Sequence, residues 1–117
     1  MGFMRVFQLS SNNLPKVMTI CPQGEQHQLG LLLFTLFLKE NGYPVIYIGT
    51  DTPLEGLGEL LNEKDIDMLA ISTSRLEDNR LIQKYIDVLT TYIPRLKFLI
   101  GGWSERSEER KERLVYY

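Results

Sequence analysis

Histidine and cysteine are the scarcest reactive residues in this sequence, because the 117-residue chain has one of each, His27 and Cys21. A single cysteine cannot form an internal disulfide, and it suits a reducing compartment such as the cytoplasm. A single histidine excludes a zinc site built from several imidazoles, and no second cysteine is present to complete one. We therefore expect a cytoplasmic protein without a structural zinc site.

Long hydrophobic runs and an excess of basic residues are also missing. The longest apolar stretch covers residues 29–38, whereas a membrane-spanning helix needs about 20 apolar residues. The first residues lack the apolar region and cleavage site of a secretion signal. The chain has a net charge of −2, whereas DNA-binding domains usually carry a basic face. The sequence predicts no membrane segment, and DNA binding only through a domain that this chain does not contain.

Several enzyme signatures are absent as well. The chain has no Gly-x-Gly-x-x-Gly or Walker loop for nucleotide phosphates. His27 has no obvious serine partner for a Ser-His-Asp triad. A phosphoacceptor receiver domain would need an aspartate after the third predicted strand, where this sequence has Ser72. We therefore expect a binding domain and not an enzyme.

Strand and helix patterns alternate from residue 16 onwards. Short β-branched or apolar runs predict strands at residues 17–21, 45–48, 68–71, 98–100 and 114–117. The second of these, with four consecutive apolar side chains, is expected to be buried on both faces. Helices are expected at residues 28–41, from 52 onwards, 74–92 and 104–112, and Thr52 and Ser74 are their expected N-caps.

This alternation predicts an α/β domain with right-handed crossovers. The expected fold is a flavodoxin-like (Rossmann-like) five-stranded parallel sheet of order 2-1-3-4-5, flanked by helices. We assign residues 1–15 to an N-terminal extension or linker and residues 16–117 to the domain. In this order strands 1, 3 and 4 are neighbours, so the loops after them meet at the edge where such sheets bind ligands.

Three motifs lie at that edge. Glu25-x-His27-x-x-Gly30 follows the first strand, Ser72-Thr73-Ser74 ends the third, and Gly101-Gly102 ends the fourth. In this order and spacing they resemble the cobalamin (B12)-binding domain, whose motif reads Asp-x-His-x-x-Gly, Ser-x-Leu and Gly-Gly. Glutamate in place of aspartate, within Cys-Pro-x-Gly-Glu-x-His, resembles the C-terminal sensor domain of MerR-type transcriptional regulators. The resemblance covers residues 16–103.

The resemblance implies a role for each motif. His27 would coordinate the cobalt of cobalamin from the lower face, and Glu25 would accept a hydrogen bond from the other imidazole nitrogen. Gly30 would let the nucleotide tail pass the first helix. The remaining cofactor-binding residues would line the tail slot; they are Ser72, Ser74, Gly101 and Gly102. Ser74 replaces the family's leucine and removes an apolar wall, and Trp103 directly follows the glycine pair.

Three functions remain open from the sequence. The first is the sensor domain of a MerR-like regulator that binds adenosylcobalamin or another cobalamin. The second is a degenerate domain that serves as a dimerisation or interaction module without a cofactor, and the third is the corrinoid carrier of a methyltransferase or mutase. His27 could also be a solvated loop residue, and Cys21 a core residue. Because residues 31–38 leave apolar side chains on nearly every side of one helix, a homodimer is expected.

Overall fold

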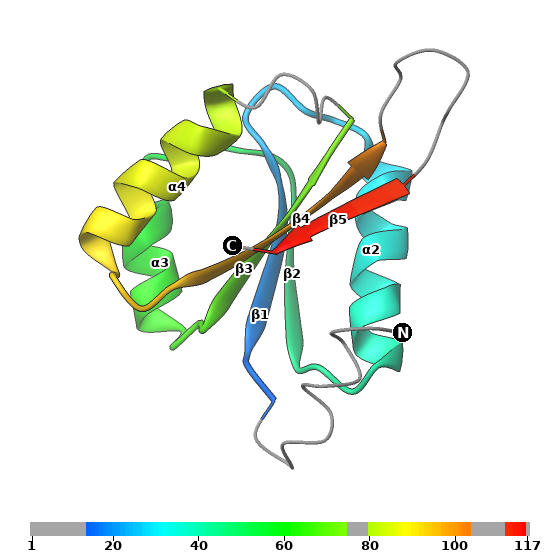
Figure 1. Cartoon of the computed structure of the whole chain (residues 1–117), viewed down its shortest axis with the longest axis horizontal. Coiled ribbons are helices and arrows are strands. Elements are labelled where there is room, and N and C mark those ends of the chain that lie inside the picture. The colour runs from blue at the N-terminus through cyan, green and yellow to red at the C-terminus, as the bar shows by residue number, and fades with distance from the viewer. Residues whose placement is uncertain (1–13, 75–79, 104–111, 117) are drawn as a thin grey trace.

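A single mixed sheet with helices on both faces forms the fold (Figure 1). The computed structural model describes residues 14–74, 80–103 and 112–116. Its strands are β1 (Val17–Pro22), β2 (Val45–Thr52), β3 (Met68–Thr73), β4 (Lys97–Trp103) and β5 (Glu112–Tyr116). Its helices are α2 (Gln28–Glu40), α3 (Leu57–Glu63) and α4 (Arg80–Tyr92). Helix α2 covers one face of the sheet, and α3 and α4 cover the other.

The strand order is β2-β1-β3-β4-β5, which confirms the predicted order 2-1-3-4-5. Strands β2, β1, β3 and β4 are parallel, as predicted. The prediction of a fully parallel sheet is wrong for β5, which pairs antiparallel with β4. A parallel crossover needs about a dozen residues or more, and the connection from β4 to β5 has only residues 104–111. The charged helix expected at residues 104–112 lies outside the described residues, except Glu112, which belongs to β5.

Side chains of the central strands alternate between two apolar layers. One layer lies against α2, where Val17 and Ala70 from the sheet pack with Phe34 and Leu38 from the helix. The other lies against α3 and α4, where Ile20 and Ile71 pack with Tyr85, among others. Strands β1 and β3 are buried at every residue because they lie inside the sheet with helices on both faces.

Strand β2 and the start of α3 differ from the predictions. β2 was expected to be buried on both faces, but it is the edge strand, and Tyr47 and Ile48 are partly exposed. The predicted helix start at Thr52 is also wrong. Thr52 is the last residue of β2, and its hydroxyl donates to the carbonyl of Gly49. Helix α3 begins at Leu57, after Gly56 in the left-handed conformation, because a turn follows the strand first.

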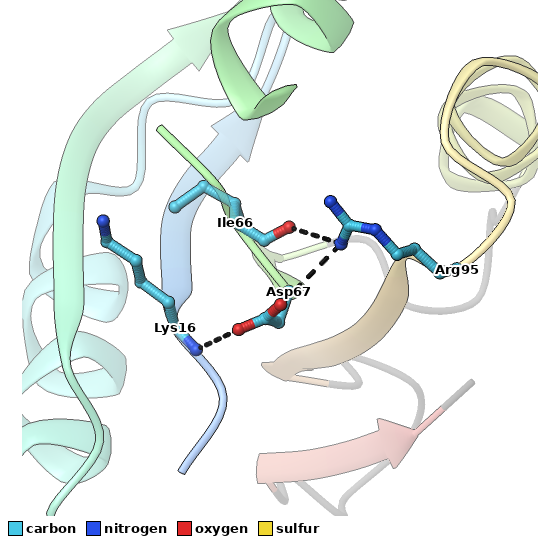
Figure 2. Close-up of polar contacts among 4 residues, drawn as sticks. All are labelled: Lys16, Ile66, Asp67 and Arg95. Carbon is cyan, nitrogen blue, oxygen red and sulfur yellow. Dashed lines mark hydrogen bonds and ion pairs between the residues drawn. The ribbon is translucent and has the colours of Figure 1, made fainter. Parts of the chain in front are cut away.

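At the edge of the sheet where the parallel strands begin, the Asp67 side chain contacts residues that precede β1 and β4 (Figure 2). Its carboxylate accepts a hydrogen bond of 3.0 Å from the backbone N–H of Lys16 and lies 3.7 Å from the guanidinium of Arg95. Arg95 also donates to the carbonyl of Ile66. Exposed ion pairs contribute little to stability, so these contacts mainly align the starts of β1, β3 and β4. The edge with the three motifs is the opposite one.

Tyr85 of α4 connects that opposite edge to the core. Its buried hydroxyl donates to the carbonyl of Thr52 at 2.6 Å and accepts a hydrogen bond from the backbone N–H of Gln23 at 2.9 Å. Burial raises the pKa of the Tyr85 phenol, so the hydroxyl keeps its proton at neutral pH and remains a donor. One side chain therefore fixes both the end of β2 and the start of the β1–α2 loop.

We expect Tyr85→Phe to lower the free energy of unfolding by about 1–3 kcal/mol, because it leaves the buried Thr52 carbonyl without its donor. Urea denaturation followed by circular dichroism measures the change. Tyr92→Phe is the matched control on the same helix, since the Tyr92 ring is 53% exposed and such surface changes usually stay within about 0.5 kcal/mol. Equal stabilities for the two variants would contradict the assigned role of the Tyr85 hydroxyl.

Candidate functional site

The β1–α2 loop, residues 23–27, is held by backbone hydrogen bonds to its neighbours. The Gly24 N–H donates to the carboxylate of Asp51 at 2.7 Å, and the Asp51 N–H donates to the carbonyl of Glu25 at 2.9 Å. Asp51 has a φ of 54°, a left-handed conformation that is uncommon for residues other than glycine, although asparagine and aspartate adopt it more readily than most. No sequence motif indicates a role for Asp51, whose two hydrogen bonds with the loop are seen only in the structure.

His27 occupies the N-cap position of α2 and is exposed to solvent. Its carbonyl accepts the first helical hydrogen bond, from the N–H of Leu31. Within the described ranges, no hydrogen bond or ion pair engages its imidazole. A neutral imidazole binds metals through either ring nitrogen, so this side chain is available as a ligand. The His27 imidazole also belongs to no larger set of metal ligands, since the described residues contain no cluster of three or more His, Cys, Asp or Glu side chains suited to hold a metal ion.

Parts of the three motifs meet on the α2 side of the sheet. A Cβ placed on Gly30 would lie 3.6 Å from the Ser72 hydroxyl and 3.7 Å from the His27 ring, so these three residues are neighbours. Ser72 is paired with Gly101 across β3 and β4, and Gly101 is buried. The structure thus brings His27, Gly30, Ser72 and Gly101 together in a row. Gly102 is paired with Thr73, next in the register.

Glu25 points to the end of β3. Its carboxylate accepts hydrogen bonds from the Ser74 hydroxyl at 2.8 Å, the Ser74 N–H at 3.1 Å and the Thr73 hydroxyl at 3.3 Å. No hydrogen bond joins it to the imidazole of His27 in this part of the chain. The sequence places Glu25 and Ser74 at one site, and the structure brings them into direct contact. Their bond was not predicted, since Ser74 is expected only as an N-cap or a slot residue.

Cys21 lies beneath this row and is completely buried. Burial, and after it the negative charge of Glu25, raise the pKa of the Cys21 thiol to about 12, although a hydrogen bond with Ser72 acts in the opposite direction. The thiol also approaches the His27 carbonyl at 3.9 Å. Because only the thiolate is nucleophilic, Cys21 is suited to packing and not to catalysis.

Two cavities lie on the other side of the loop. A cavity of about 120 Å³ is lined by Glu25, Thr73 and Ile82, among others. An open groove of about 930 Å³ runs between α3 and α4, and Gln23 lies at its edge. Neither of these two cavities is lined by His27, Gly30 or Ser72.

We expect the native domain to react with a thiol reagent such as DTNB far more slowly than the unfolded chain. With a pKa of about 12, roughly one Cys21 thiol in ten thousand is ionised at pH 8, against about a quarter at the ordinary value of about 8.5. Absorbance of released thionitrobenzoate, with and without urea, gives both rates. Equal rates in the two conditions would show that Cys21 is accessible and ionised in the fold.

Comparisons with curated proteins find partial relatives of two kinds. The HTH-type transcriptional repressor CarA of Myxococcus xanthus is 34% identical over 61 residues, which is 52% of this chain and 21% of the relative. Methionine synthase of Mycobacterium leprae is 26% identical over 82 residues, which is 68% of this chain and 7% of the relative. The chain therefore spans only a minor part of the curated relatives it matches.

Solved structures share the fold. A cobalamin-binding protein from Desulfitobacterium hafniense aligns with a TM-score of 0.66 and 20% identity, over 85% of this chain and 49% of that one. The methanol:cobalamin methyltransferase complex MtaBC from Methanosarcina barkeri aligns with a TM-score of 0.66 and 24% identity, over 75% of this chain and 34% of that one. The family model of the B12 binding domain matches residues 15–116. Since that match covers nearly the whole sequence, the chain belongs to the family of B12-binding domains.

Proposed function

We propose that this domain binds a cobalamin and that His27 coordinates the cobalt from its lower face. The observation that carries the proposal is the exposed imidazole at the start of α2, which has no hydrogen bond within the described residues and lies beside Gly30 and Ser72. His27 would hold a cobalamin through an imidazole nitrogen, and the cofactor would supply the cobalt to which that nitrogen binds. His27 is the chain's only histidine, so this coordination depends on one residue.

The residues below His27 suit the nucleotide tail of a cobalamin. Gly30 leaves the α2 backbone bare opposite the Ser72 hydroxyl, where a Cβ would come into van der Waals contact with the Ser72 oxygen at 3.6 Å. Gly101 lies at the same register as Ser72 and has no side chain to fill the slot. Ser72 offers a hydroxyl that can donate to or accept from a heterocyclic base. Gly102 and Ser74 remain proposed members of this slot.

We further propose that the chain acts as the sensor domain of a MerR-like transcriptional regulator. The similarity to the CarA repressor supports it, as does glutamate in the histidine motif. DNA would be bound by a separate domain, because this chain has a net charge of −2. In this role the domain is not an enzyme and acts in the cytoplasm. No described helix is long and apolar enough to cross a membrane.

Two other functions remain as alternatives. A corrinoid carrier of a methyltransferase or mutase is favoured by the similarity to methionine synthase. A degenerate domain that serves as a dimerisation or interaction module without cofactor is favoured by Ser74, whose N–H and hydroxyl both donate to Glu25.

We expect the purified domain to bind hydroxocobalamin and adenosylcobalamin in the dark and to convert them to the base-off, histidine-bound form. His27→Ala should weaken binding by more than the roughly 10–100-fold that follows loss of a ligand's hydrogen-bond partner. Absorbance titration measures both. Gln26→Ala is the control, because Gln26 is an exposed neighbour in the same loop.

Electron paramagnetic resonance of the cob(II)alamin complex identifies the lower ligand directly. Protein labelled with ¹⁵N should change the nitrogen splitting of the cobalt signal, because the axial nitrogen then comes from His27. No binding by the wild-type domain would favour the interaction module. Binding that His27→Ala leaves intact would rule out His27 as the ligand.

The exposed face of α2 is apolar, which is consistent with the homodimer expected from the sequence. Leu29, Leu32, Leu33 and Leu36 are each between 44% and 63% exposed and recur at helical spacing. No charged residue occurs from Gln28 to Leu38. Such a stripe is self-complementary, since an isologous dimer would place leucines against leucines without like-charge repulsion. We propose a second copy of this chain as its partner.

We expect the wild-type domain to sediment as a concentration-dependent dimer and Leu33→Glu to sediment as a monomer, because a buried carboxylate without a partner is strongly unfavourable. Analytical ultracentrifugation over a concentration series measures this. Val88→Glu is the control, because it adds the same charge at an exposed apolar residue of α4, on the other face of the sheet, and should leave the dimer intact. A wild-type monomer throughout the series would refute self-association through α2.

A further inference from the structure

Strand β2 has an irregularity where it lies beside the end of β1. Ile20 of β1 is paired with Gly49 of β2, and Pro22 is paired with Thr52. Between these two pairs β1 has one residue and β2 has two, so β2 carries an extra residue there. Such β-bulges are rare between parallel strands, and next to active sites they give a side chain a new direction. The second of the two residues of β2 in this interval is Asp51.

Asp51 offers both its side chain and its backbone to the β1–α2 loop. Its Oδ1 accepts a hydrogen bond from the Gly24 N–H at 2.7 Å, and its own N–H donates to the carbonyl of Glu25 at 2.9 Å. Its φ of 54° lies in the left-handed region, and backbone outliers of this kind cluster at functional sites. Because Asp51 is exposed, its side chain is not part of the apolar core, and the loop is what it holds.

The two loop residues that Asp51 holds lie just before His27. One residue separates Glu25 from His27, and α2 begins directly after His27. On that other side, the His27 carbonyl accepts the first hydrogen bond of α2, from the Leu31 N–H. His27 therefore lies between an anchor on β2 and an anchor in α2. A loop that the protein itself holds in place has less conformational freedom to lose when a ligand binds to it.

From the bulge and the two hydrogen bonds we infer that Asp51 is a positioning residue for His27, and that the affinity of the domain for cobalamin depends on it. The inference rests on the proposed function, in which His27 is the cobalt ligand. Asp51 acts through the backbone of Gly24 and Glu25 and is assigned no contact with the cofactor.

The test is the affinity for hydroxocobalamin, measured by absorbance titration. Asp51→Gly removes the carboxylate, and because glycine adopts a positive φ without strain, the main loss is the hydrogen bond to Gly24. This variant should bind about three- to tenfold more weakly than the wild type, which is the factor that one net hydrogen bond contributes. Asp51→Asn keeps an oxygen acceptor, and asparagine also adopts the left-handed conformation. It should bind nearly as the wild type does.

Asp65→Gly is the matched control. Asp65 is also exposed and has a φ of 55°, but it precedes β3, at the edge of the sheet where the parallel strands begin. The same substitution there has the same effects on backbone strain and on the entropy of the unfolded chain, so the affinity should equal that of the wild type. Urea denaturation checks that both glycine variants are folded. Equal weakening of binding by both would indicate a general structural effect and contradict the inference.

A second measurement does not involve cobalamin. Exchange of the Gly24 N–H with water, followed by NMR of the ¹⁵N-labelled domain, should be faster in Asp51→Gly than in the wild type or Asp51→Asn, because hydrogen bonding protects amides from exchange. Unchanged exchange, or binding by Asp51→Gly as tight as that of the wild type, would overturn the inference while cobalamin binding stands. Absence of binding by the wild-type domain would overturn the proposed function and the inference with it.

Discussion

The hydrogen bonds that fix the β1–α2 loop against β2 and α4 are the constraint on which the candidate site depends. Gly24 donates to Asp51, Asp51 donates back to Glu25, and Gln23 donates to the hydroxyl of Tyr85. Each bond uses a backbone group that would otherwise need water, since a loop has no regular partners for its N–H and C=O groups. With the loop fixed on both sides, the start of α2 and therefore His27 are placed without a hydrogen bond from the imidazole to any described residue.

The parallel order of the strands brings this loop to the candidate site at the carboxyl edge of the sheet. Parallel order places the carboxyl ends of β1 and β3 side by side, so the loop after one strand meets the last residues of the other. Polar and small residues lie at this edge, whereas the earlier residues of the inner strands are mostly apolar and form the core. Val17, Ala70 and Leu99 bury the lower part of the α2 face, whereas Cys21, Ser72 and Gly101 continue the same rows toward the edge. Stability and recognition thus occupy successive parts of the same strands.

The sequence was sufficient for the order of the sheet and for the convergence of the motifs, because hydrophobic periodicity and crossover rules determine both. It failed for β5, where the short connection after β4 forces a reversal of direction, and for β2, whose apolar residues lie at an edge of the sheet. It also missed Asp51, Tyr85 and the Glu25–Ser74 contact. These depend on side chains separated by 27 to 62 residues along the chain, and nothing in local composition indicates which distant donor reaches which acceptor.

The position of His27 also determines what kind of selectivity this domain can provide. In the proposed function, the imidazole at the open edge would meet the flat cofactor from one side, and the row of Gly30, Ser72 and Gly101 lies on that same side. All described groups that we assign to the cofactor would therefore act on its lower face and its tail. Differences among upper ligands act on the opposite face, which these residues do not touch. In that function, the response to an upper ligand would belong to whatever covers that face, and this domain would contribute the affinity that depends on His27 and the row beside it.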